Sequence, residues 1–172
     1  TLFVRPTITG TVASVGGYES QKYRRPQVDA TTGQASRDVA KIIMRYAEAL
    51  LIYAEAKAEL GTITQADLDI SINKLRPRAG IPNMTLANIT KNPNWPNYGY
   101  SLSPLLQEIR RERTVELMNE GFRLDDLMRW KANGLLVGQR AKGAYYETGW
   151  TTGQKKDANN YLDPYQTSYP TG

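Results

Sequence analysis

The stretch RRERTVELMNEGFRLDDLMRW, residues 110–130, sets five acidic and five basic side chains among eight large apolar ones. Ser103 followed by Pro104 is a typical helix start, because a capping side chain precedes a proline at the first helical position. A helix should run from there to about residue 120 and stop at a glycine. A second helix should cover 123–132. The stretch therefore predicts a helical hairpin.

An earlier hairpin is predicted from RDVAKIIMRYAEALLIYAEAKAELG, residues 37–61. This segment runs without a helix breaker from an N-cap at Ser36 or Asp38 to Gly61, the residue type expected just past a helix end. Its charges fall on one narrow stripe, which predicts an inner helix that is covered on more than one side. A short connection leads to a helix over 65–75, which should lie antiparallel to it.

The composition of the 172 residues limits the class of protein. The length and the 40% apolar content favour one domain or a piece of a larger one, with a helical core at about 38–132 and irregular segments at 1–35 and 143–172. No signal peptide or membrane span is visible. Cysteine and histidine are absent, which excludes disulfides, zinc fingers and Ser-His-Asp catalysis. The net charge of +5 forms no basic stripe on the charged helices, so we expect no nucleic-acid partner.

Three of the five acidic residues of 110–130, Glu112, Glu116 and Glu120, belong to a row with four-residue spacing that begins at Glu108. One interpretation is a carboxylate metal site or an acid–base pair, but a di-iron site needs Glu-x-x-His and this chain has no histidine. The favoured interpretation is a framework of ion pairs between packed helices. We therefore predict no catalytic residue, no metal ligand and no cofactor, and leave a structural calcium ion open. The predicted framework residues are Arg45, Glu48, Glu112, Arg113, Glu116 and Arg123.

The loop over 92–100 carries the candidate ligand contacts. Trp95, Tyr98 and Tyr100 could stack on the flat C–H faces of sugar rings, while neighbouring asparagine amides bond to hydroxyl groups. The competing interpretation is an aromatic loop that packs against its own helices, because aromatic rings commonly serve packing.

Three segments in series carry a resemblance to a known family. RYAEALLIYAEAKAELG (45–61), INKLRPRAGIP (72–82) and EIRRERTVELMNEGFRLDDLMRW (108–130) resemble, in order and spacing, the C-terminal region of the SusD/RagB family of nutrient-binding outer-membrane lipoproteins. The resemblance implies that 1–172 is a single partial domain, the C-terminal part of such a protein. It implies a mainly α fold of tetratricopeptide-like helical hairpins with long irregular loops. It also implies a binding protein without catalysis, on the outer face of the outer membrane of a Gram-negative cell.

In that family an N-terminal lipid, absent from this chain, provides the membrane attachment, and a TonB-dependent, SusC-like barrel transporter receives the glycan or peptide. We therefore expect a cell-surface subunit for glycan uptake. No ligand residue of the family maps onto this sequence, so Trp95, Tyr98 and Tyr100 rest on their chemistry alone. The alternative function is a helical-repeat scaffold that binds only protein partners.

Overall fold

The structure is a computed structural model that describes Gly16, Tyr18, Lys22 and residues 42–136, 142–147 and 155–163. The chain divides into two compact units, Arg37–Leu135 and a unit that joins Thr1–Ser36 with Leu136–Gly172. Each unit is described by itself, and the single partial domain over 1–172 stays a prediction. All helices of the described residues lie in the unit Arg37–Leu135, named here the helical unit.

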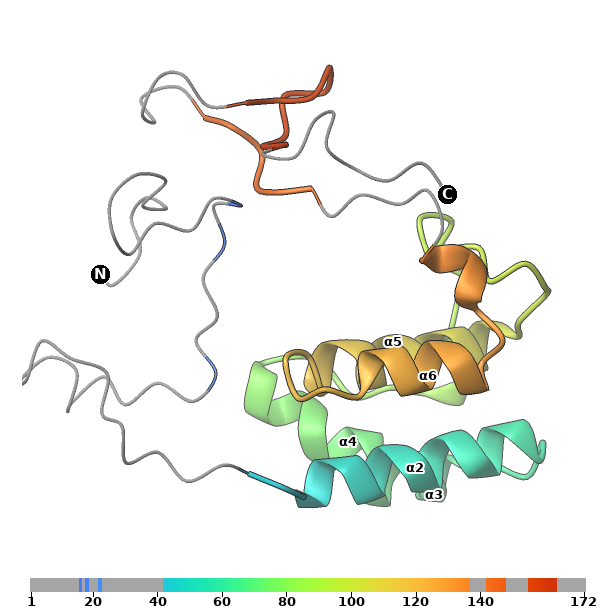
Figure 1. Cartoon of the computed structure of the whole chain (residues 1–172). Helices are drawn as coiled ribbons and strands as arrows, with labels where there is room; N and C mark the ends of the chain where they lie inside the picture. Colours follow the sequence, from blue (N-terminus) through green and yellow to red (C-terminus); the bar gives the residue numbers. More distant parts are fainter. Residues whose placement is uncertain are drawn as a thin grey trace, which may run out of the picture. The chain divides into compact units, whose positions relative to one another are not determined.

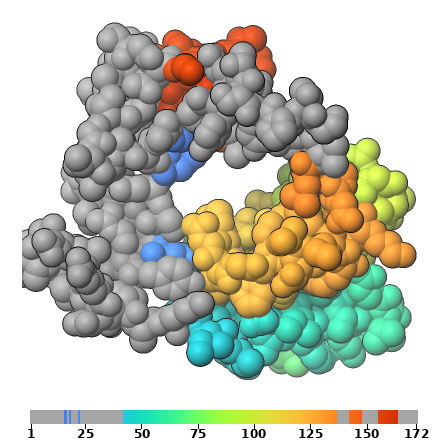
Figure 2. Space-filling view, viewed as in Figure 1, coloured from blue at the N-terminus to red at the C-terminus, as the bar shows by residue number. Residues whose placement is uncertain are grey.

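The predicted mainly α fold is confirmed by the helical unit (Figure 1). Its described α-helices are α2 (Tyr46–Glu59), α3 (Gln65–Ile70), α4 (Ile72–Leu75), α5 (Pro104–Glu116) and α6 (Arg123–Arg129). The 3-10 helices are η1 (Arg76–Ala79), η2 (Leu86–Asn88) and η3 (Asn133–Leu135). Helix α2 packs along α5 and also contacts α3 and α4. Figure 2 shows side chains of α2, in cyan, meeting those of α5 and α6, in yellow to orange.

Helix α2 begins later than the sequence predicts. The predicted caps Ser36 and Asp38 lie outside the described residues, but residues 42–45 are described and are not helical. Arg45 has an extended backbone (φ −143°, ψ 155°), and its guanidinium bonds carboxylates of the α5 end instead of lying along a helix. The end of α2 is confirmed, since Gly61 follows it with a φ of +66° that favours glycine.

The predicted helix over 65–75 is two helices, because the backbone breaks at Ser71 (φ −120°, ψ −98°). The Ser71 hydroxyl donates to the backbone carbonyl of Asp67 at 2.5 Å, a local bond of the kind that bends helices. Helix α3 begins with a capping box, in which Thr64 and Asp67 each accept from the other's backbone N–H.

The start of α5 is confirmed and its predicted end is wrong. Ser103 accepts from the backbone N–H of Leu106 at 3.2 Å, and Pro104 is the first helical residue. The helix stops at Glu116 and not near residue 120, and Asn119 then takes a left-handed φ of +64°. Helix α6 likewise ends at Arg129 and not at 132, because Lys131 adopts a φ of +52° that an α-helix cannot contain.

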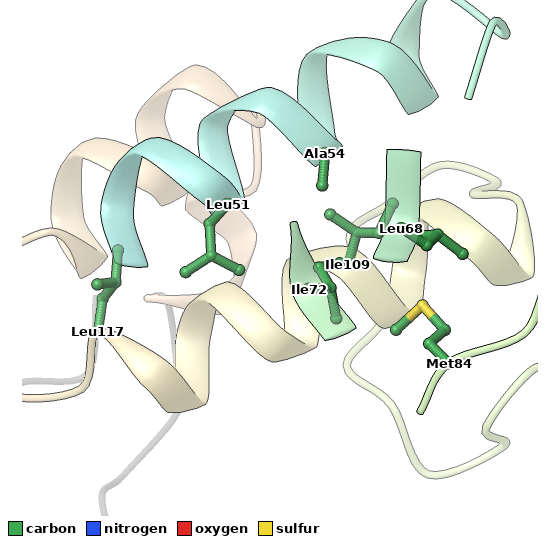
Figure 3. Close-up of a cluster of buried hydrophobic side chains, with 7 residues drawn as sticks. All are labelled: Leu51, Ala54, Leu68, Ile72, Met84, Ile109 and Leu117. Carbon is green, nitrogen blue, oxygen red and sulfur yellow. The ribbon is translucent and has the colours of Figure 1, made fainter. Parts of the chain in front are cut away.

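The core of the helical unit lies between α2, α3, α4 and α5 (Figure 3). Its buried side chains are Leu51, Ala54, Leu68, Ile72, Met84, Ile109 and Leu117. The prediction that α2 is covered on more than one side is wrong over part of its surface, because Tyr46 is 74% exposed and Ile52 is 52% exposed.

The second unit is described over two short segments and Gly16. Isolated antiparallel bridges join Tyr145 to Tyr161 and Lys156 to Leu162. Ala144 donates its backbone N–H to the Gly16 carbonyl at 2.8 Å. The irregular segment predicted over 143–172 therefore contains local β-pairing.

Candidate ligand-binding site

The loop between η2 and α5 holds the three aromatic residues that the sequence predicts as ligand contacts. Two asparagine side chains shape it: Asn92 accepts from the backbone N–H of Asn94, and Asn97 accepts from that of Gly99, both at 2.9 Å. Gly99 has a φ of +86°, which favours glycine. These local turns fix the path of the backbone between the aromatic rings.

Tyr98 lies in the core, because it is only 6% exposed and packs with Leu127, Trp130 and Ala132. Its ring meets the Trp130 ring edge-on, with centroids 6.0 Å apart and an interplanar angle of 79°. Core packing covers the ring, so the Tyr98 ring is not a surface on which a sugar can stack. The position of the Tyr98 ring agrees with the interpretation that the aromatic loop packs against its own helices.

Tyr100 is 41% exposed and its hydroxyl is held on two sides. The hydroxyl accepts from Arg110 Nη1 at 2.7 Å and donates to the backbone carbonyl of Trp130. Its ring centroid lies 6.1 Å from that of Tyr98. Tyr100 therefore presents part of its ring to solvent from a fixed position.

A cavity of about 260 Å³ opens beside these rings. It is lined by Lys91, Asn92, Pro93, Trp95, Pro96, Asn97, Tyr98, Tyr100, Leu102 and Gln107. Two polar atoms of its lining residues, Trp95 Nε1 and the Tyr98 hydroxyl, are buried and have no hydrogen-bond partner within the described residues. A buried polar atom without a partner costs about 1–3 kcal/mol, so a partner supplied on binding would be favourable for both atoms.

The guanidinium of Arg110 contacts the aromatic rings beside this site. It lies among three rings, with its central carbon 4.8 Å from the Trp130 centroid and 5.7 Å from the Tyr98 centroid. Its Nη2 donates to Glu59 at 2.8 Å. Arg110 therefore connects the aromatic loop to helices α2 and α5, and it is a positioning residue.

A network of ion pairs continues from Arg110 through Glu55 to α6. Glu55 of α2 accepts from Arg129 at 2.6 and 2.8 Å and from the Trp130 ring N–H at 2.5 Å. Asp126 accepts from Arg113 Nε with both oxygens at 2.9 Å. Burial lowers the pKa of Arg129, but the hydrogen bonds and charges of Glu55 and Asp126 outweigh this and raise it. The network fixes where the Trp130 ring stands.

Sequence reasoning did not select Arg110, Glu55 or Asp126, although all three are buried. A signal for Glu55 was present, because a carboxylate in the middle of a helix predicted to be inner needs a cationic partner. The identity of that partner depends on tertiary packing, since Glu55 and Arg129 are 74 positions apart.

Some of the predicted framework residues form ion pairs in the structure and others do not. Arg45 pairs with Glu116 at 2.5 Å and with Glu120 at 2.7 Å, and within the described residues Glu48 has no ion pair. Those carboxylates raise the pKa of Arg45, with Glu120 contributing most. Arg123 donates to the Thr114 hydroxyl at 2.9 Å and lies over the Trp130 ring. Ion pairs that include the remaining predicted residues are Arg76–Glu112, Arg78–Glu116 and Arg113–Asp126.

Glu112 is largely covered, and burial raises its pKa although the nearby Arg76 lowers it. Among the residues that the structure describes, no three or more carboxylates gather where they could hold a metal ion. In the same residues no helix has the length and apolar character needed to cross a membrane.

Comparison with known proteins places this geometry in a family. The model of the SusD family matches residues 9–171. A solved structure of a SusD-like carbohydrate-binding protein from Bacteroides fragilis is similar to the chain, with 30% sequence identity and a TM-score of 0.62. The match covers 87% of this chain and 28% of that protein. No protein of curated function matches the sequence.

Proposed function

Since this chain belongs to the SusD family, we propose that it is a glycan-binding part of a cell-surface protein and not an enzyme. The observation that carries the proposal is the cavity of about 260 Å³, where Trp95 Nε1 and the Tyr98 hydroxyl lack partners within the described residues. Sugars supply both hydroxyl groups for the polar lining residues and apolar faces that would contact Trp95 and Tyr100.

Gln107 adds a further polar group to the same cavity. It is buried and lines the cavity, and the described residues give its side-chain amide no hydrogen-bond partner. An amide both donates and accepts, as sugar hydroxyls do. Apolar and aromatic side chains together with a few polar groups are the usual composition of a small-molecule site.

Calorimetric titration with an array of oligosaccharides tests this function. Trp95→Ala should weaken binding of a captured oligosaccharide roughly tenfold, because it removes an aromatic contact and a hydrogen-bond donor. Tyr46→Ala is the matched control, since it truncates an exposed aromatic residue on α2 of the same unit. Equal binding by the wild type and Trp95→Ala would place any glycan site elsewhere.

We also propose that the whole protein sits on the outer face of the outer membrane through an N-terminal lipid and passes its glycan to a TonB-dependent, SusC-like barrel. Family membership supports this proposal. Gentle isolation from the native membrane should recover the barrel at near-equal stoichiometry. Recovery of the protein alone would contradict the delivery step and leave glycan binding standing.

A scaffold that binds only protein is the second candidate. The exposed apolar residues Ile43, Met44 and Tyr46, at the start of α2, favour it. This candidate predicts that no oligosaccharide binds and that Trp95→Ala leaves binding to a copurified partner unchanged.

A further inference from the structure

A larger cavity of about 540 Å³ adjoins the aromatic one. The two share Lys91, Asn92 and Pro93 in their linings, so they are neighbours along this part of the loop. No aromatic residue lines the larger cavity. Its remaining lining residues are Arg76, Asn83, Met84, Thr85, Asn88, Ile89, Thr90, Glu108 and Arg111.

The lining of the larger cavity carries three cations and one carboxylate. Arg111 donates through Nη1 to Glu108 at 2.8 Å, which leaves other N–H groups of its guanidinium for a ligand. Arg76 pairs through Nη1 with Glu112 at 3.1 Å, and its buried Nε has no hydrogen-bond partner within the described residues. The two arginines are therefore held in place with donors to spare.

Several polar groups of the larger cavity are not used by the fold. The side chains of Lys91, Asn83 and Asn88 have no hydrogen-bond or ion-pair partner in the described part of the chain. Lys91 matters most, because it lines both cavities. It is also the cation that the two linings have in common.

We propose that this cavity binds the carboxylate of an acidic sugar unit whose neighbouring unit occupies the aromatic cavity. The inference rests on the proposed glycan-binding function and narrows it to oligosaccharides that contain uronic acids. Lys91 and Arg111 bind the carboxylate by charge-assisted hydrogen bonds, and the amides of Asn83 and Asn88 bond the hydroxyl groups of the same unit. Arg111 is kept in position by Glu108.

Paired oligosaccharides test the inference directly. An array of uronate-containing oligosaccharides is titrated together with the carboxyl-reduced counterpart of each, which keeps the sugar backbone and removes the charge. The wild type should bind the best acidic member roughly tenfold more tightly than its reduced counterpart, a preference that falls as salt rises. Lys91→Gln combined with Arg111→Gln should abolish the preference, so that the acidic member and its reduced counterpart bind with similar affinity.

Lys74→Gln is the control for net charge. Lys74 is exposed on α4 and lies outside both cavity linings, so the preference should survive its loss. Equal binding of acidic and reduced members by the wild type overturns the acidic-sugar inference and leaves glycan binding standing. A preference that persists in the Lys91→Gln, Arg111→Gln variant overturns it as well. Failure of every member of the array to bind overturns both the inference and the glycan-binding function.

Discussion

Ile109 and Arg110 are neighbours on α5, and the fold buries them by different means. Ile109 packs against the apolar core of α2, α3 and α4. Arg110 turns to another side, where Glu59 accepts its hydrogen bond and three aromatic rings surround it. One side of the helix is held by dispersion and the hydrophobic effect, which have little directional preference. The other is held by hydrogen bonds that require particular atoms in particular places.

The difference bears on function. The apolar side joins α5 to the rest of the core, and none of the buried side chains of that core lines the aromatic cavity. The charged side fixes Tyr100, because its hydroxyl is bonded both by Arg110 and to the Trp130 carbonyl. Trp130 is fixed in turn by Glu55. The charged side of α5 therefore sets the geometry of the aromatic cavity.

The largest effect is expected when a substitution places a charge in the apolar core that α5 shares with α2. Leu51→Asp buries a carboxylate where Ile109 and Ile72 offer no donor, and Leu51 is fully buried. We expect a loss of at least about 4 kcal/mol in the free energy of unfolding, measured by urea denaturation. Leu51→Ala is the control for lost volume and should be milder. Equal stability of Leu51→Asp and wild type would contradict the burial of α2 against α5.

The charged side is probed by a double-mutant cycle on Arg113 and Asp126, which are both buried. Arg113→Met alone should cost about 3 kcal/mol, since Asp126 loses a partner and keeps only Arg129. Asp126→Leu in addition should recover most of this loss, because an apolar pair replaces a buried ion pair at little net cost. Additive losses in the cycle would show that the two side chains do not act as a pair.

Tyr100→Phe tests whether the charged side positions the site. Removing the hydroxyl deletes the bonds to Arg110 and Trp130 and should lower stability by roughly 1 kcal/mol. Oligosaccharide affinity should fall together with stability, because the ring is then free to move. A loss of stability in Tyr100→Phe without a loss of affinity would contradict this. It would show that the bonds to Arg110 and Trp130 do not position the Tyr100 ring for ligand binding.

The parts of this comparison that the sequence predicts are the local ones. The cap at Ser103, the proline after it and the glycine that ends α2 are set by neighbours within a few positions, and all three are confirmed. The break at Ser71 escaped prediction, because a serine inside an apolar pattern bends a helix only when its hydroxyl finds a backbone carbonyl.

Pairings between distant charges could not be predicted in detail. The four-residue spacing from Glu108 indicated a row of charges but not their partners. Arg45 reaches Glu116 across 71 positions only because the chain before α2 is extended. The sequence likewise presented Tyr98 and Tyr100 as equivalent. Packing separates them, since one ring fills the core and the other stays part exposed.

The smallest expected effect concerns a carboxylate at the edge of the apolar side. Asp67, at the start of α3, accepts from the Tyr53 hydroxyl at 2.5 Å and from Thr64, and these bonds hold the pKa of its carboxyl well below its usual value, the Tyr53 bond most. A carboxyl whose pKa is lower in the folded state stabilises the fold at neutral pH. That contribution shrinks as the pH falls below the unfolded value of about 3.9 and through the folded pKa.

Asp67→Asn should therefore be less stable than wild type at pH 7, and the difference should narrow steadily as the pH falls below about 4. Urea midpoints across this range give the measurement. Glu112 has a raised pKa, so its effect on the pH dependence of stability has the opposite sign. This effect is common to both proteins and cancels when their stabilities are subtracted. Leu51→Ala supplies the contrast from the apolar side, where the loss should be the same at every pH. The difference in stability between wild type and Asp67→Asn could instead stay constant down to the pH of acid unfolding. That result would mean that Asp67 stabilises α3 through its packing and neutral hydrogen bonds and not through its charge.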